Sequence, residues 1–207
     1  MDTKRNSNGE LRADPKLFPS GMKSLGDYIH SKNLKFGIYL SAGTKTCSKK
    51  STNKTATGWG SFGKEKIDAA TIASFGADYL KYDGVCDVPA PPHGVSVMRW
   101  QQEIVTRMGV ALNETNRHIY YQYGSPYVWQ GRYVPFVGEK LAKNGGLNGW
   151  RSSFDMSDSW VMVQQQIDGP WGALQWARNG LAGPQHWPDF DDLEIGNGNF
   201  NPKTKQG

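Results

Sequence analysis

Aspartates follow two of the apolar, strand-like stretches of this sequence. Asp83 ends the stretch "YLKYD", and Asp155 ends "WRSSFD" 72 residues later. Two carboxyl groups at one edge of a sheet can divide nucleophilic and acid–base work between them. The Asp-Gly pair that begins at Asp83 also has a simpler interpretation, because this dipeptide most often turns the chain. The residues by themselves leave both interpretations open.

Lys81 is predicted to lie on the same face of its strand as Asp83, because side chains two residues apart point the same way. Its ammonium group could stabilise the carboxylate of Asp83 and donate to hydroxyl groups of a ligand. An ion pair at the rim of the sheet is the alternative interpretation.

The composition is that of one globular domain. The chain has 207 residues, of which 37% are hydrophobic and 12% aromatic, enough to form a sizeable core. No apolar run approaches the roughly 20 residues that span a bilayer, and the polar start is typical of neither a signal peptide nor an anchor. Residues 1–66 hold thirteen Lys and Arg against five Asp and Glu, within a net charge of +5. These basic residues lack interleaved aromatics, so nucleic acid is disfavoured as a partner. The absence of a long apolar run disfavours a membrane partner.

Helical and extended patterns alternate along the chain. Apolar spacing predicts helices at residues 19–33, 63–76, 94–116, 137–146, 157–168 and 170–180. Apolar stretches predict strands at residues 34–43, 77–83, 118–124, 148–155 and 183–190. Serial repeats of this kind indicate an α/β fold with a parallel sheet, either open or closed into a barrel.

Polar residues end nearly every predicted strand: Ser41, Asp83, Gln122, Asp155 and Asp189. Their convergence at one edge is typical of a (β/α)₈ TIM barrel. No glycine-rich phosphate fingerprint follows the first strand, which disfavours a dinucleotide-binding sheet. The pattern therefore favours the barrel.

Four blocks of the sequence resemble the catalytic barrel of the α-galactosidases, or melibiases, of glycoside hydrolase family 27. They are "FGIYLSAGTKTC", "FGADYLKYDGVC", "WRSSFDMSDSW" and "AGPQHWPDFDDLEIGNG", in the family's order and spacing. The resemblance covers nearly the whole chain and implies that residues 1–207 form a partial (β/α)₈ catalytic domain, with about five to six of eight β-α units. It implies two further strands before residue 1, and an eighth strand and an antiparallel β domain after the chain. We therefore expect a chain truncated at both ends, with little activity of its own.

The resemblance implies a retaining O-glycoside hydrolase that releases terminal α-galactose by double displacement, without metal or cofactor. Asp83 is implied to be the nucleophile and Asp155 the acid/base. Their carboxyl groups are then expected about 5 to 5.5 Å apart, the spacing of retaining enzymes. The substrate-binding residues implied by the resemblance are Lys81, Arg151, Tyr39, Asp189 and Asp191.

The two cysteines, Cys47 and Cys86, are paired by the resemblance in a disulfide across the mouth of the site; two free thiols are the alternative. Cys86 follows Asp83 by three residues, where the family commonly has two. Sequons at Asn53 and Asn113 favour a secreted or lysosomal/vacuolar glycoprotein. A homodimer is one assembly consistent with the resemblance.

The sequence defines the sugar specificity less well than it defines the mechanism. After the strand at 118–124 the family carries a Cys-Glu-Trp-like signature that reads the 2-position of the sugar, whereas this chain has "YGSPYVWQG". A β-L-arabinopyranosidase or an α-N-acetylgalactosaminidase is therefore an alternative. A non-catalytic carbohydrate-binding or degenerate fragment is another.

Overall fold

A computed structural model describes residues 5–46, 60–84, 86–124, 146–151, 155–169, 174, 178 and 182–192. Along the chain its elements are α1 (Gly21–Ser31), β1 (Gly37–Ser41), α2 (Glu65–Ser74), β2 (Tyr79–Asp83), α3 (Val97–Glu114), β3 (Tyr120–Tyr123), β4 (Gly149–Arg151), α5 (Trp160–Ile167) and β5 (Trp187–Asp189). The five predicted strands and four of the predicted helices are thereby confirmed. The predicted helix at 137–146 lies outside the described residues, as does nearly all of that at 170–180.

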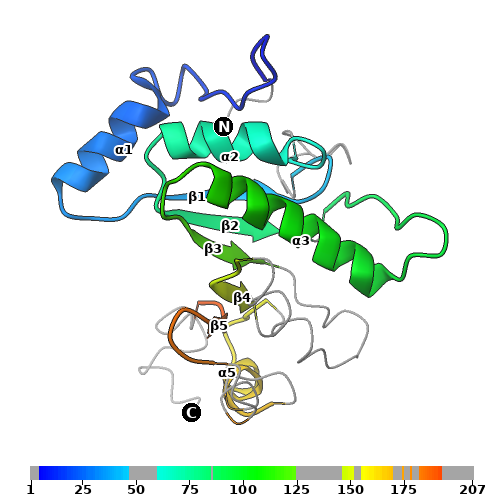
Figure 1. Cartoon of the computed structure of the whole chain (residues 1–207). Helices are drawn as coiled ribbons and strands as arrows, with labels where there is room; N and C mark the ends of the chain where they lie inside the picture. The colour runs from blue at the N-terminus through cyan, green and yellow to red at the C-terminus, as the bar shows by residue number, and fades with distance from the viewer. Residues whose placement is uncertain are drawn as a thin grey trace.

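The five strands form one parallel sheet in the order β1-β2-β3-β4-β5 (Figure 1). Each strand pairs with the next in the chain, so all the carboxyl ends lie along one edge of the sheet. Strand β4 pairs with its neighbours over Gly149–Arg151, and residues 152–154 of the predicted strand lie outside the described residues.

The two faces of the sheet differ in what covers them. Helices α2 and α3 lie over one face (Figure 1), which carries the buried apolar side chains of Ile38, Leu80 and Tyr121. The opposite face carries Tyr39, Lys81 and Gln122, which are register partners on β1, β2 and β3. Because successive side chains of a strand point to opposite faces, one face of the sheet is packed with apolar side chains and the other is polar.

The ends of α3 and α2 follow local rules of chain geometry. The hydroxyl of Ser96 accepts a hydrogen bond from the N–H of Arg99 and caps the start of α3. After α2, Gly76 adopts a φ of +82°, a conformation that suits glycine and stops the helix. These signals are local, and for this reason the helices could be predicted.

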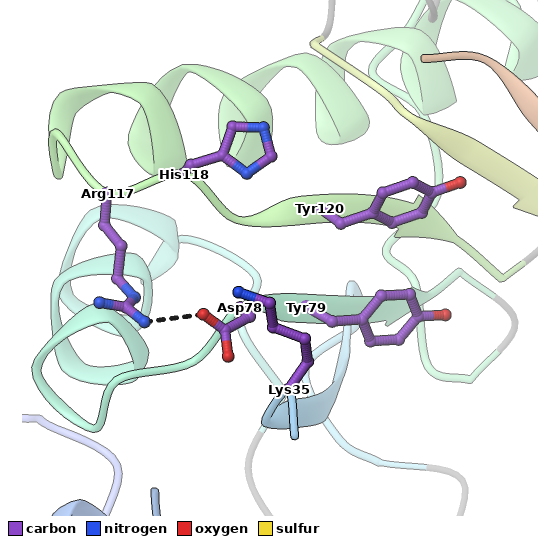
Figure 2. Close-up of a pocket in the computed structure, with 6 residues that line it drawn as sticks. All are labelled: Lys35, Asp78, Tyr79, Arg117, His118 and Tyr120. Atoms are coloured by element: carbon purple, nitrogen blue, oxygen red, sulfur yellow. Dashed lines mark hydrogen bonds and ion pairs between the residues drawn. The ribbon is translucent and has the colours of Figure 1, made fainter. Parts of the chain in front are cut away.

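Asp78 joins three segments at the amino end of β2, opposite the edge where the strands finish. Its Oδ2 accepts hydrogen bonds from the N–H of Phe36 (2.9 Å) and pairs with Nε2 of His30 (2.7 Å), and Arg117 donates to its Oδ1 (2.9 Å; Figure 2). Burial acts to raise the pKa of Asp78, but the Phe36 N–H and His30 outweigh it and hold the pKa below its ordinary value. Asp78 therefore stabilises the fold as a carboxylate.

Asp78→Asn is expected to lower the free energy of unfolding by about 1 to 3 kcal/mol near neutral pH, the range for hydrogen bonds to a charged group. Because the folded-state pKa of Asp78 is depressed, this contribution is present above the unfolded value of about 3.9 and is lost as the pH falls through the lower folded value. Urea unfolding of both proteins between pH 7 and pH 2 measures it. If the difference in urea midpoint between the wild-type protein and Asp78→Asn grows as the pH is lowered, the assignment is contradicted.

No helix within the described part of the chain is long and apolar enough to cross a membrane.

Candidate active site

Asp83 stands at the carboxyl end of β2 and receives a hydrogen bond from a neighbouring strand. The hydroxyl of Tyr39, on β1, donates to its Oδ2 at 2.5 Å. Burial raises the pKa of Tyr39 above its ordinary value, and the hydrogen bond to Asp83 and its charge act in the same direction. The phenol therefore keeps its proton and holds one carboxylate oxygen of Asp83 in place.

The sheet register places Asp83 in one row with other functional side chains. Asp83 pairs with Ser41 on β1, and two strands further on Arg151 pairs with Asp189. Gly124 separates the two pairs: its N–H donates to the carbonyl of Tyr82, and a Cβ at this position would lie 3.3 Å from the Cα of Asp83. The carboxyl ends of the strands thus bring together residues that are far apart in the sequence.

Lys81 lies in the next row, between Tyr39 and Gln122. It is two residues before Asp83 on the same face of β2, as its spacing predicts. No hydrogen bond or ion pair to another described residue occupies its ammonium group. Lys81 can therefore donate to a ligand bound over this face.

Arg151 is shared between two carboxylates. Its guanidinium donates to Oδ1 of Asp155 at 3.1 Å and to Oδ2 of Asp191 at 2.9 Å. Strand β4 is described as far as Arg151, and the side chain of Asp155, four residues later, is 95% exposed. Residues 152–154 lie outside the described residues, so the placement of Asp155 at the end of this strand stays a prediction. The ion pair with Arg151 nevertheless holds Asp155 at the carboxyl-end edge.

Asp189 and Asp191 make contacts within the protein. Asp189 accepts a hydrogen bond from the side-chain amide of Gln122 on β3, and its Oδ1 accepts the N–H of Asp191 at 2.9 Å. Asp191 also accepts the N–H of Met156 at 2.8 Å. Their prediction as substrate ligands stays untested, while these contacts show that they order the site.

Gln122 is a site residue that was not assigned on the sequence. It lies beside Lys81 in the register and connects β3 to β5 through Asp189. The signal that could have identified it was present, because Gln122 is a polar residue within an otherwise aromatic strand.

The loops after β1 and β2 are joined beside Asp83. The carbonyl of Asp87 accepts a hydrogen bond from the N–H of Thr44 (3.0 Å), and its Oδ2 accepts one from the hydroxyl of Thr44 (2.5 Å). A Cβ at Gly43 would lie 1.9 Å from the carbonyl oxygen of Cys86, so this close approach requires glycine. Cys86 is disulfide-bonded, but Cys47 lies outside the described residues, so their pairing stays a prediction. These contacts therefore fix the loop after β1 to the loop after β2.

A cavity of about 480 Å³ lies at the opposite edge of the sheet, lined by Lys35, Asp78, Tyr79, Arg117, His118 and Tyr120 (Figure 2). The rings of Tyr79 and Tyr120 stack there at 5.6 Å. In parallel α/β sheets the carboxyl edge carries the chemistry and the amino edge serves stability. We therefore place the candidate active site at the Asp83 edge.

Among the described residues, no group of three or more His, Cys, Asp or Glu side chains is arranged to hold a metal ion.

Tyr39→Phe is expected to reduce kcat/KM by roughly 10- to 100-fold, because one hydrogen bond to a charged group contributes about 1.5 to 3 kcal/mol. The loss should fall mainly on kcat, since the phenol contacts Asp83, the carboxylate that is expected to act as the nucleophile. Steady-state kinetics of the full protein provide the measurement, with Tyr28→Phe, on the exposed surface of α1, as the control. Equal kinetics for the two variants would contradict this assignment.

Known proteins resemble this chain along most of its length. A family model described as alpha galactosidase A matches residues 1–206. The chain is 38% identical over 202 residues to an alpha-galactosidase of Oryza sativa subsp. japonica, covering 95% of this chain and 40% of that protein. It is also 38% identical over 202 residues to alpha-galactosidase A of Homo sapiens, covering 95% and 41%. The solved structure of the Saccharomyces cerevisiae alpha-galactosidase with raffinose superimposes with a TM-score of 0.71 at 29% identity, covering 94% of this chain and 42% of that one.

The chain thus spans about two fifths of the length of these relatives. The matched structures and the parallel sheet confirm the predicted fold class: β1 to β5 and their helices are part of a (β/α)₈ barrel.

Proposed function

Because the chain belongs to the α-galactosidase family, glycoside hydrolase family 27, we propose that it carries the catalytic carboxylates of a retaining glycosidase that releases terminal α-galactose. The observation that carries this proposal is the arrangement of Asp83, hydrogen-bonded to Tyr39, in one row with Arg151, which in turn holds Asp155. Because the chain spans about two fifths of the length of these relatives, the activity is proposed for the protein as a whole.

In the first step, a carboxylate oxygen of Asp83 attacks the anomeric carbon, and the bond from that carbon to the leaving oxygen breaks. Asp155, in its protonated form, gives its proton to the leaving oxygen. The hydroxyl of Tyr39 holds Oδ2 of Asp83 by a hydrogen bond and so orients the attacking carboxylate. The exposure of Asp155 suits its place beside the departing group, since that group must leave towards solvent.

In the second step, Asp155 is a carboxylate and removes a proton from water, and the resulting hydroxide equivalent attacks the anomeric carbon. The ester to Asp83 breaks and galactose leaves with its original α configuration. Throughout both steps Lys81 donates to hydroxyl groups of the sugar bound over the polar face of the sheet. Arg151, Asp189 and Asp191 belong to the same wall of the site.

Hydrolysis of p-nitrophenyl α-galactoside by the full protein tests this function, with proton NMR used to follow the product. Appearance of α-galactose before its mutarotation is the expected result. First appearance of the β anomer would contradict retention, and no turnover with measurable galactose binding would favour the non-catalytic alternative. Parallel assays with p-nitrophenyl β-L-arabinopyranoside and p-nitrophenyl α-N-acetylgalactosaminide show which sugar the enzyme prefers.

We further propose that the protein is a secreted or lysosomal/vacuolar glycoprotein. The disulfide at Cys86 supports an oxidising compartment, because such bonds are rare among cytosolic proteins. Assembly as a homodimer stays a prediction.

A further inference from the structure

The guanidinium of Arg151 is buried, with 6% of its side chain exposed, and the two carboxylates that pair with it among the described residues differ sharply in environment. Asp191 is 21% exposed, whereas Asp155 is 95% exposed. A buried charge needs a permanent counter-charge, because removing its partner leaves it poorly solvated. The better buried carboxylate, Asp191, is suited to be that partner.

Asp191 is also fixed more firmly than Asp155. It accepts the N–H of Met156 in addition to the Arg151 guanidinium, and its own N–H donates to Asp189. Its backbone has a φ of +71°, an unusual value for a residue other than glycine. Local contacts therefore hold Asp191 against Arg151, and the Met156 bond also ties it to the residue that follows Asp155.

This arrangement bears on a conflict in the chemistry of Asp155. A general acid must be protonated when the leaving group departs, but an adjacent guanidinium favours the carboxylate form. If Asp155 were the counter-ion on which Arg151 depended, its protonation would leave a buried charge unpaired. With Asp191 in place, Arg151 keeps a partner while Asp155 takes up a proton.

We propose that Asp191 is a positioning residue that acts as the standing counter-ion of Arg151, so that Asp155 can alternate between acid and carboxylate. This inference rests on the proposed function. Without the charge of Asp191, Arg151 holds Asp155 as a carboxylate. The first step then lacks its proton donor, whereas the second step, which needs the carboxylate, is preserved.

The test compares two substrates of the full protein, phenyl α-galactoside and 2,4-dinitrophenyl α-galactoside. The phenyl leaving group needs protonation, and the dinitrophenyl group does not. Asp191→Asn is expected to lower kcat/KM for the phenyl substrate by about 100-fold and for the dinitrophenyl substrate by no more than about threefold, since general acid catalysis typically contributes 10²- to 10⁴-fold. Asp192→Asn, which removes the same charge one residue along, is the matched control and should change neither rate.

A second variant keeps the inference testable if Asp191→Asn does not fold. The double variant Arg151→Gln/Asp191→Asn removes the guanidinium together with its counter-ion. Absolute rates should fall, but the ratio of the two kcat/KM values should return to within about threefold of the wild-type ratio, because Asp155 is again able to take up a proton.

The outcomes separate this inference from the proposed function. Equal losses on both substrates for Asp191→Asn would overturn it, because a purely structural defect does not depend on the leaving group. Asp155→Ala should itself be selective for the phenyl substrate. If it is selective and Asp191→Asn is not, the inference is wrong and the function stands. If Asp155→Ala lowers both rates equally, the assignment of the acid/base fails.

Discussion

Asp83→Asn in the full protein is expected to lower kcat/KM for an aryl α-galactoside by on the order of 10⁴-fold, a scale typical for loss of a catalytic nucleophile. The amide is nearly isosteric with the carboxylate, so the sheet should be preserved, but its oxygen is a poor nucleophile towards the anomeric carbon. The hydrogen bond from Tyr39 can still be made to the amide oxygen. Steady-state kinetics of the folded wild-type and Asp83→Asn proteins, prepared in the same way, measure the change in kcat/KM.

Asp27→Asn is the control for this variant. Asp27 lies on the exposed surface of α1, where it pairs with Lys23 four residues before it. Its loss should leave kcat/KM within about twofold, because exposed helix pairs contribute only about 0.3 to 0.5 kcal/mol to stability. Mass spectrometry of a trapped glycosyl-enzyme should further place the sugar on the peptide that contains Asp83. Near-normal turnover by Asp83→Asn, or a sugar on another carboxylate, would show that the nucleophile is elsewhere.

Arg5→Leu is expected to destabilise the fold by about 3 to 5 kcal/mol, the range for removing one partner of a buried ion pair. The carboxylate of Asp68, on α2, is fully buried and is met by both terminal nitrogens of Arg5, at 2.5 and 2.8 Å. Arg5 also donates to the carbonyls of Gly9 and Gly60, at 2.8 and 3.0 Å. Its loss leaves the buried charge of Asp68 without this partner and detaches the segment before α1 from α2.

Urea unfolding at neutral pH measures this effect. The double variant Arg5→Leu/Asp68→Leu should recover much of the lost stability, because no unpaired charge then remains buried. Lys23→Leu, at an exposed pair, should change the free energy of unfolding by less than about 1 kcal/mol. A midpoint for Arg5→Leu equal to that of Lys23→Leu would mean that Asp68 does not depend on Arg5.

The sequence by itself determined the elements and the side chains that each strand presents together. Helical spacing and strand-like runs identified α1, α2, α3, α5 and all five strands. Because side chains alternate along a strand, Lys81 and Asp83 were placed on one face of β2. An aspartate at the carboxyl end of this strand indicated chemistry there. These features depend on a few neighbouring residues, so a single sequence is enough to read them. The family resemblance then supplied identities for residues that periodicity could not assign.

Only the tertiary structure decided which of those residues meet, and how. Tyr39 reaches Asp83 across 44 positions, Arg151 reaches Asp191 across 40, and Arg5 reaches Asp68 across 63. Register between strands depends on which face of each strand is buried and on the connections between the strands, so it is fixed only when the strands pack together. For this reason the sequence could name the two carboxylates, whereas the sharing of Arg151 between Asp155 and Asp191 became apparent only in the folded chain.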